Sequence, residues 1–200
     1  MEFSMKESNE LTLKVIGSLE DFKKNLEEKG YKQDKHFILD DIYMIPSDLE
    51  LDKLSTREII SKAIIIRNVE DISNQEIEKM IVYKVKKINE KGEILEQKSI
   101  IMKIHDIREA EKFMESIGYK SIMNIIEDDY EYRKDNFSIL TKDVKNGDAL
   151  IEVETEVGNS KMDTIEKLKE FLEGENLPLD FSNLFIKKAE VELNKILGRD

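Results

Sequence analysis

Three glutamates alternate with apolar residues in the last third of the chain. Glu152, Glu154 and Glu156 are each two positions apart, with apolar residues between them. Residues two apart on a β-strand share a face, so a strand here would have one acidic face and one apolar face. Carboxylate oxygens on such a face could hold a hard divalent cation. The alternative is an ordinary strand with its polar side in water, which is a common arrangement.

Basic residues form a second set with possible chemistry. Four of them stand within predicted strands beside apolar neighbours: Lys14, Arg67, Lys84 and Lys103. They are candidates for contacts to an anionic ligand, because enclosure strengthens charge-assisted hydrogen bonds. The alternatives are a solvated strand face and ion pairs with the glutamates.

The overall charge limits the kind of partner. The 200 residues include 44 acidic and 32 basic side chains, which gives a net charge of −12. Broad binding to nucleic acid or to an anionic membrane needs a basic surface, so neither is expected. A polyanionic ligand would need a local, enclosed basic cluster.

Several other chemistries are excluded or disfavoured. The chain has no cysteine, which excludes disulfides, thiolate catalysis, Cys-ligated zinc and iron–sulfur clusters. His36 and His105 have no partner at metal-ligand spacing and are expected on the surface. No signal peptide and no apolar run of transmembrane length is visible, which predicts a cytoplasmic location.

The elements that must position these residues follow from hydrophobic periodicity. Two helices open at capping residues, Ser18 and Asp106, and end at Gly30 and Gly118. Strands are predicted at 10–16, 31–45, 63–69, 77–88, 94–104, 121–133, 137–144 and 149–157, with a turn at 89–92. Further helices are predicted at 55–61, 162–173 and 181–197.

The chain also contains an internal repeat. A strand at 11–15, a helix and then Gly-Tyr-Lys at 30–32 are echoed by a strand at 100–104, a helix and Gly-Tyr-Lys at 118–120. Two such halves could close one barrel, which would remove exposed sheet edges. We therefore expect an α+β fold with a closed antiparallel β-barrel, or tunnel, of about eight strands and pseudo-two-fold symmetry. The whole chain, 1–200, would be a single domain with helices 162–173 and 181–197 packed outside.

The order of these motifs resembles the CYTH, or triphosphate tunnel, family over nearly the whole chain. That family opens on a Glu-x-Glu-x-Lys strand, where this chain has Glu10, Thr12 and Lys14. The family's Asp-x-Tyr is matched by Asp41 and Tyr43, and its Arg-x-Arg strand is matched in part by Arg67. Its Tyr-Lys strand is matched by Tyr83 and Lys84, and its Gly-aromatic pair by Gly118 and Tyr119. A second Glu-x-Glu of the family is matched by Glu152 and Glu154.

The resemblance implies a metal-dependent phosphohydrolase such as a triphosphatase. Inward-facing Lys14, Arg67, Lys84 and Lys103 would bind the phosphates of a small molecule such as tripolyphosphate. Glu10, Glu152 and Glu154 would hold Mg²⁺ or Mn²⁺, a cofactor that only the resemblance suggests. Adenylate cyclase activity is less expected, because no nucleobase pocket is evident. The alternative is a non-catalytic relative with a degraded site that binds a ligand or a protein.

The departures from the family are concentrated at charged positions. The family's residues are replaced at Ile65, Ile101, Lys103, Glu127, Asp129, Lys142 and Asp148. Glu127 and Asp129 reverse two positive charges. They could add metal ligands, form salt bridges with Lys14 and Lys103 that close the tunnel, or lie in a solvated strand end. The last two interpretations are favoured over the first.

Overall fold

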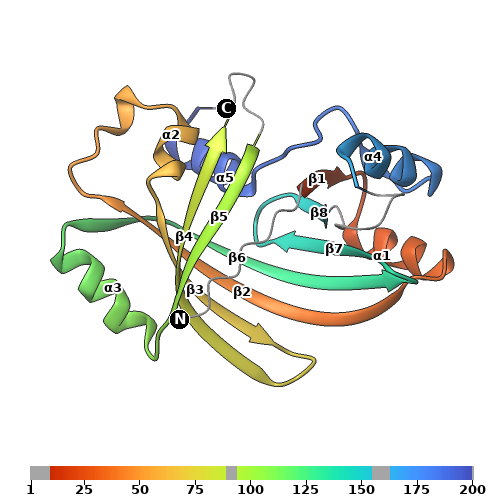
Figure 1. Cartoon of the computed structure of the whole chain (residues 1–200), viewed down its shortest axis with the longest axis horizontal. Coiled ribbons are helices and arrows are strands. Elements are labelled where there is room, and N and C mark those ends of the chain that lie inside the picture. The colour runs from red at the N-terminus through yellow and green to blue at the C-terminus, as the bar shows by residue number, and fades with distance from the viewer. Residues whose placement is uncertain (1–9, 89–93, 155–162, 200) are drawn as a thin grey trace. The chain divides into compact units, whose positions relative to one another are not determined.

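The computed structural model describes residues 10–88, 94–154 and 163–199 (Figure 1). The first half of the chain contains β1 (Glu10–Val15), α1 (Leu19–Glu28), β2 (Lys32–Pro46), a 3-10 turn at Leu51–Lys53, α2 (Thr56–Ser61), β3 (Ile64–Asp71) and β4 (Glu76–Ile88). The second half contains β5 (Ile94–Lys103), α3 (Ile107–Ser116), β6 (Tyr119–Lys134), β7 (Phe137–Val144), β8 (Ala149–Glu154), α4 (Ile165–Gly174), β9 (Leu179–Asp180) and α5 (Lys188–Leu197). The predicted α+β class is confirmed. The turn predicted at 89–92 and the position of Glu156 lie outside the described residues.

The chain divides into two compact units. Unit 1 is formed by Ile38–Ile126 and Lys188–Asp200, and unit 2 by Glu7–Phe37 and Glu127–Lys187, apart from the residues that are not described. The unit boundaries fall within β2 and β6, so each of these strands contributes to both units. That the whole chain forms one domain stays a prediction.

The strand order reflects the predicted repeat. The antiparallel sheet has the hydrogen-bonded order β5-β4-β3-β2-β6-β7-β8-β1-β9. The strands that follow β2 towards one edge are β3, β4 and β5, and those that follow β6 towards the other edge are β7, β8 and β1. Strands at the same place in these two series also hold the same place in the two halves of the sequence. Each half thus contributes a strand, a helix and three further strands.

The two repeat helices also begin and end alike. The Ser18 side chain accepts a hydrogen bond from the Asp21 amide, and the Asp106 side chain accepts one from the Glu109 amide. After each helix the backbone turns through a glycine with positive φ, 87° at Gly30 and 91° at Gly118. Glycine adopts this conformation without the steric cost of a side chain.

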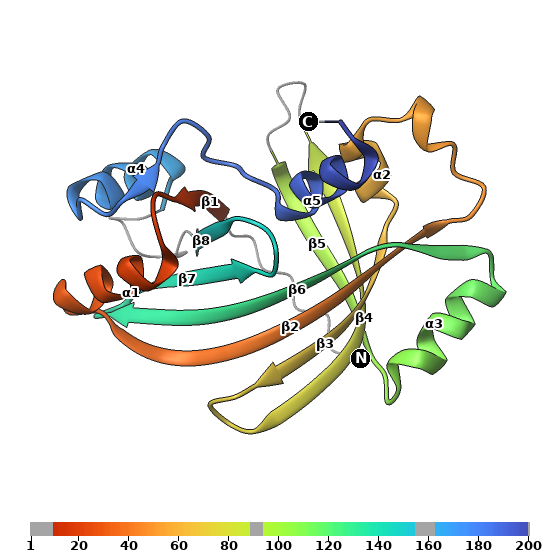
Figure 2. The same ribbon diagram turned by 180° about the vertical axis from the view of Figure 1, so that it is seen from behind.

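Each unit has its own apolar core. In unit 2, α1 and α4 pack on the apolar face of β1 and β8 through residues such as Phe22, Leu168, Leu13 and Ile151 (Figure 2). In unit 1, α3 packs through Ala110 and Met114 against Met44 of β2 and Ile66 of β3. In unit 1 the second face also carries apolar residues, since Ile65 of β3 and the opposed Val82 of β4 are buried.

The expected closed eight-stranded barrel is not what the hydrogen bonds form. In the described residues β5 and β9 end a nine-stranded sheet, with no pairing between them. The outer edge of β1 is used by the segment around β9 instead: β9 pairs with Lys14 and Val15. The Thr12 amide also donates to the Leu184 carbonyl at 3.1 Å. This edge is therefore occupied within unit 2.

The helix predicted at 181–197 begins only at Lys188. The preceding residues form Asx turns: the Asp180 side chain accepts from the Ser182 amide at 2.9 Å, and Asn183 accepts from the Phe185 amide at 3.1 Å. Such side chain to backbone bonds compete with helix formation. The apolar residues that suggested helical periodicity, Phe181 and Leu184, instead pack against the core of unit 2.

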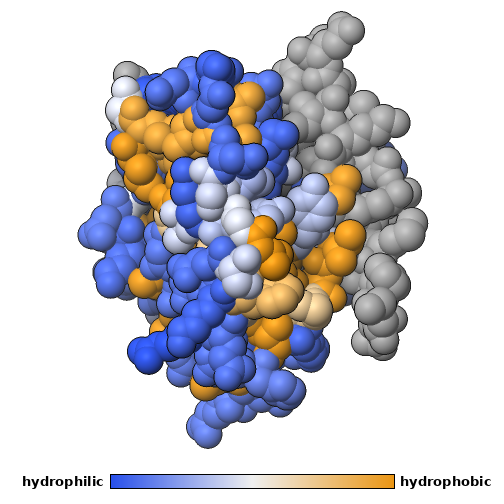
Figure 3. All heavy atoms as spheres, turned by 90° about the vertical axis from the view of Figure 1, so that its left-hand side faces the viewer, coloured by the Kyte–Doolittle hydropathy of each residue, from blue (hydrophilic) through white to orange (hydrophobic). Residues whose placement is uncertain are grey.

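Apolar side chains also remain on the surface. Figure 3 shows hydrophobic patches among hydrophilic residues on one face of the molecule, and the exposed apolar side chains of unit 1 include Phe113 of α3 and Ile117 directly after it. In the ranges that the structure describes, we find no helix with the length and apolar character needed to cross a membrane.

Candidate functional site

The three predicted metal ligands converge in unit 2. Glu10 of β1 lies directly opposite Glu154 of β8, and Thr12 lies opposite Glu152. Because opposed residues on antiparallel strands share a face, all three carboxylates project from the same side of the sheet. One oxygen from each lies within 4.8 Å of the others. Oxygen donors at this spacing are suited to a hard divalent cation.

Two lysines accompany this acidic cluster. Lys142 Nζ of β7 lies 2.7 Å from Glu152 Oε2, and Lys187 Nζ lies 3.8 Å from Glu10 Oε1. Burial would lower the pKa of Lys142, but the carboxylates of Glu152 and Asp129 raise it above its usual range. Lys142 is therefore charged at neutral pH and neutralises part of the cluster.

Two acidic residues of β6, Glu127 and Asp129, are buried. Glu127 and Asp129 are 0 % and 1 % exposed, so the interpretation as a solvated strand end is wrong. Asp129 lies opposite Lys142 in the β6–β7 register, and its charge acts on that ammonium. Asp129 stands where the family pattern has a basic residue, and Lys142 stands where it has an acidic one. These two departures from the pattern therefore lie opposite each other. Salt bridges of these acids with Lys14 and Lys103 stay a prediction, and the basic residue that the register places opposite Asp129 is Lys142.

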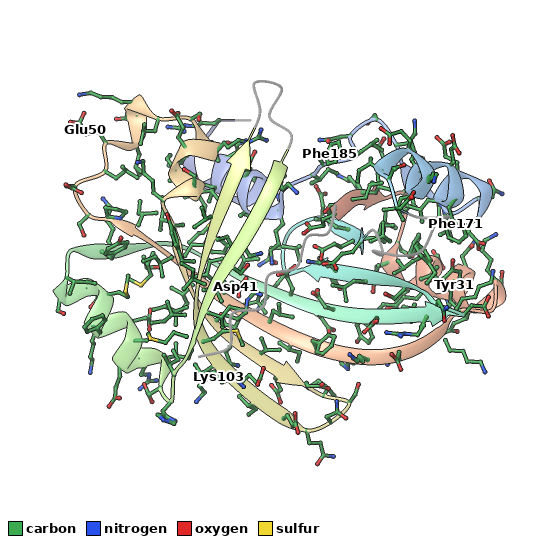
Figure 4. The ribbon with its side chains drawn as sticks, in the orientation of Figure 1. Tyr31, Asp41, Glu50, Lys103, Phe171 and Phe185 are labelled. Atoms are coloured by element: carbon green, nitrogen blue, oxygen red, sulfur yellow. The ribbon has the colours of Figure 1, made fainter. Side chains whose placement is uncertain are left out.

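Unit 1 holds a second charged cluster around Asp41, labelled in Figure 4. Arg67 Nε donates to Asp41 Oδ1 at 2.6 Å, and Arg67 Nη2 donates to Oδ2 at 2.6 Å. Burial would raise the pKa of Asp41, which is 0 % exposed, but the hydrogen bonds and charge of Arg67 lower it below its usual value. The charge of Lys84 on β4 also lowers it. The paired guanidinium fixes the planar orientation of both groups.

Lys188, the first residue of α5, completes this cationic cluster. Its Nζ lies 3.6 Å from Asp41 Oδ2, the oxygen that already accepts from Arg67. Burial lowers the pKa of Lys188 to about 7; Asp41 opposes this shift, and the charges of Arg67 and Lys84 add to it. When ionised, Asp41, Arg67, Lys84 and Lys188 together carry three positive charges and one negative charge.

The other two predicted phosphate contacts lie in exposed ion pairs. Lys14 Nζ lies 2.6 Å from Asp148 Oδ1, and Lys103 Nζ lies 2.5 Å from Glu78 Oε1. Lys14 belongs to unit 2, whereas Lys103 belongs to unit 1 and lies at the end of β5 (Figure 4). Their role in phosphate binding stays a prediction.

The two histidines differ from each other. His105 is exposed, as expected. His36 is not an isolated surface residue, because its Nε2 lies 2.6 Å from Asp128 Oδ1 and its ring stacks on Tyr130 with centroids 4.1 Å apart. The sequence contained no local signal for this pairing, since its partners lie on a strand of the other repeat.

Lys142, Lys187 and Lys188 are basic residues of the two clusters that sequence reasoning did not place there. In the sequence, Lys142 was noted only as a departure from the family pattern. The charge at Asp129 is also reversed relative to that pattern, and this was a signal that the two changes compensate. Lys188 was not singled out in the helix predicted at 181–197, and it is half-buried because α5 packs through the neighbouring Ala189 and through Leu193. No local pattern marked it.

Comparison with solved structures identifies the fold. PH1819 from Pyrococcus horikoshii superposes with a TM-score of 0.67 at 21% identity, over 94% of this chain and 99% of that one. A Vibrio parahaemolyticus protein provisionally assigned as an adenylate cyclase has a TM-score of 0.60 at 10% identity, over 98% and 99% of the two chains. No family model and no curated protein matches this chain.

A third structure is similar over a comparable length. HpAC1 from Hippeastrum, provisionally assigned as an adenylyl cyclase, is reported with a dominant triphosphatase activity. It has a TM-score of 0.58 at 13% identity and covers 93% of this chain and 94% of its own. At sequence identities this low, structural similarity shows only that the architecture is shared. The order of the strands, the repeat and these structures agree that the chain has a CYTH-like fold.

Proposed function

We propose that this protein binds a divalent metal ion and a phosphorylated small molecule of the tripolyphosphate type, and that it hydrolyses this molecule. The observation that carries the proposal is the convergence of Glu10, Glu152 and Glu154, whose oxygens lie within 4.8 Å of one another. The reported triphosphatase activity of HpAC1, which shares the fold, supports the choice of ligand.

The donor set fits Mg²⁺ or Mn²⁺. All three ligands are carboxylates, the oxygen donors that these hard ions prefer. When bound, such an ion supplies polarisation of a phosphoryl oxygen or activation of water. Within the protein, Lys142 and Lys187 hold two of these carboxylates in place.

The cationic cluster of unit 1 fits the anionic ligand. Arg67, Lys84 and Lys188 surround the single buried carboxylate of Asp41 and leave an excess of positive charge. Partial enclosure strengthens contacts from such groups to phosphate oxygens. Arg67 is held by two hydrogen bonds, so little conformational entropy is lost when it binds.

A second candidate is a non-catalytic CYTH-like protein that binds a ligand or a protein partner. The observation that favours it is the ion pair at 2.7 Å between Lys142 and Glu152, because an internal ammonium competes with a metal ion for that carboxylate. This candidate predicts weak metal binding and no turnover.

The deciding experiment measures phosphate release from tripolyphosphate, ATP and thiamine triphosphate with Mg²⁺ or Mn²⁺. The Glu152→Gln, Glu154→Gln double variant should abolish metal-dependent turnover. The matched control is Glu28→Gln with Glu170→Gln, which makes the same chemical change at two exposed helix positions of unit 2. Turnover that survives in the first variant would contradict the metal assignment, and no turnover in the unmodified protein would favour the second candidate.

A further inference from the structure

Lys188 is the member of the cationic cluster with the least favourable surroundings for a charge. Its Nζ approaches Asp41 Oδ2 at 3.6 Å, whereas Arg67 Nη2 is bound to that same oxygen at 2.6 Å. The aspartate is thus shared, and Arg67 has the shorter contact. The side chain of Lys188 is 16% exposed, so water contributes little to its solvation.

The charged groups that act on Lys188 include side chains from three strands. They are Asp41 on β2, Arg67 on β3 and Lys84 on β4, of which two are cations. On α5 itself, Glu190 binds Arg57 of α2 at 2.9 Å and Glu192 binds Lys195 at 2.8 Å. The acids nearest to Lys188 in sequence are therefore engaged elsewhere.

Arg67 and Lys188 differ in how they respond to such surroundings. A guanidinium keeps its proton at any pH that proteins tolerate, whereas a lysine releases its proton when it is buried beside other cations. Burial and these neighbours bring the pKa of Lys188 to about 7, so a large fraction of the side chain is a neutral amine at physiological pH. A multivalent anion beside the same groups would restore its charge.

We propose that Lys188 is a third cation of the anion site and that it takes up a proton from solvent when a polyphosphate binds. This inference rests on the anion-binding part of the proposed function. The reaction is RNH₂ + H⁺ → RNH₃⁺, with the proton supplied by the buffer and no covalent change in the ligand. Its consequence is that polyphosphate affinity falls as the pH rises above 7.

Calorimetry with the full chain tests this coupling. Tripolyphosphate is titrated without metal at pH 6 and pH 8, each in two buffers of different ionisation enthalpy, and the number of protons exchanged is obtained from the difference. At pH 8 the unmodified protein should take up close to one proton more than Lys188→Arg. Comparison with this variant removes the contribution of the ligand's own protonation.

The variants also give an affinity pattern. The affinity of the unmodified protein should fall by up to about tenfold for each pH unit above 7, relative to Lys188→Arg. At pH 6, Lys188→Met should bind about tenfold more weakly, the order expected for loss of one charge-assisted contact. Equal proton numbers in the unmodified protein and in Lys188→Arg would overturn the inference while leaving anion binding intact.

A second measurement follows the reactivity of the Lys188 amine, without and with tripolyphosphate. The rate of acetylation of Lys188 is followed by mass spectrometry from pH 5.5 to 9.5, with the exposed Lys112 of α3 as the internal reference. Tripolyphosphate should slow labelling of Lys188 and leave Lys112 unchanged. Labelling of Lys188 that tripolyphosphate does not alter would overturn its place in the anion site. Loss of metal-dependent turnover with this protection intact would instead count only against the proposed hydrolysis.

Discussion

Units 1 and 2 share a scaffold and differ in the charge placed on it. In each, a buried aspartate on a long strand meets a basic residue from the next strand: Asp41 with Arg67, and Asp129 with Lys142. The two aspartates are separated by 88 residues, the same offset that separates Ser18 from Asp106. The repeat therefore extends from the backbone to a buried aspartate with a basic residue on the neighbouring strand.

Hydrogen bonds between β2 and β6 residues repeat at the same offset. His36 Nε2 lies 2.6 Å from Asp128 Oδ1 in unit 2, and Asn124 Nδ2 donates to Asp40 Oδ1 at 2.6 Å in unit 1. His36 and Asn124 are 88 positions apart, and so are Asp40 and Asp128. Such agreement between side chains distant in sequence is not expected of two unrelated amphipathic helices.

The divergence lies on the adjoining strands. Arg67 is opposite Met80 and Lys142 is opposite Leu150. Four residues further along these strands, unit 1 has Lys84 and unit 2 has Glu154. Side chains two or four positions apart on a strand lie on the same face. The comparison shows that equivalent positions on that face carry a cation in one unit and an acid in the other.

The largest effect is expected when Arg67 is removed. Arg67→Met leaves the fully buried Asp41 without its bidentate partner and should lower the free energy of unfolding by about 4 kcal/mol, measured by urea denaturation. Adding Asp41→Asn should recover part of this loss in a double-mutant cycle. A loss below about 1 kcal/mol would show that the two buried aspartates do not depend on their cations alike.

The corresponding change in unit 2 is Lys142→Met. It removes the ammonium beside Glu152 and Asp129 and should cost about 3 kcal/mol. Here Mn²⁺ should restore stability, since a metal ion can neutralise the same carboxylates, whereas Arg67→Met should not respond to Mn²⁺. Thermal unfolding with and without Mn²⁺ measures the difference. An equal response of the two variants would remove the distinction between an acidic and a cationic unit.

Lys188 should make unit 1 sensitive to pH. Its folded pKa of about 7 lies below its ordinary value near 10.5, so between these values the unfolded chain binds more protons and stability rises with pH. At pH 6, where the charge is buried, Lys188→Met should be more stable than the unmodified protein by about 2 kcal/mol, and the gap should shrink by pH 9. Urea denaturation at both values tests this, with Lys112→Met as the exposed control. A gap that grows with pH would reverse the assigned shift.

The smallest effects concern the two equivalent helix caps. Ser18→Ala in unit 2 and Asp106→Ala in unit 1 each remove one side chain acceptor at a helix start and should each cost about 1 kcal/mol. Similar values from urea denaturation would support equivalent scaffolds. A severalfold difference between the two would show that the helices contribute unequally.

Local patterns predicted most of the elements. The hairpin strands were expected at 77–88 and 94–104 and are observed at Glu76–Ile88 and Ile94–Lys103. The caps at Ser18 and Asp106 and the turns at Gly30 and Gly118 were also correct, because these preferences act within a few residues. The final helix was predicted too long, since the side chains of Asp180 and Asn183 bond locally to the backbone.

The sequence by itself determined the α+β class, the repeat and the acidic face of Glu152 and Glu154, since each depends on periodicity or on residues close together in the chain. Only the tertiary structure brought Glu10 beside Glu154, placed Asp129 opposite Lys142 and brought Lys188 next to Asp41. It also placed the segment around β9, rather than β5, on the edge of β1. The physical reason is that strand pairing and burial depend on which distant segments meet, and a local pattern specifies a face but not its partner.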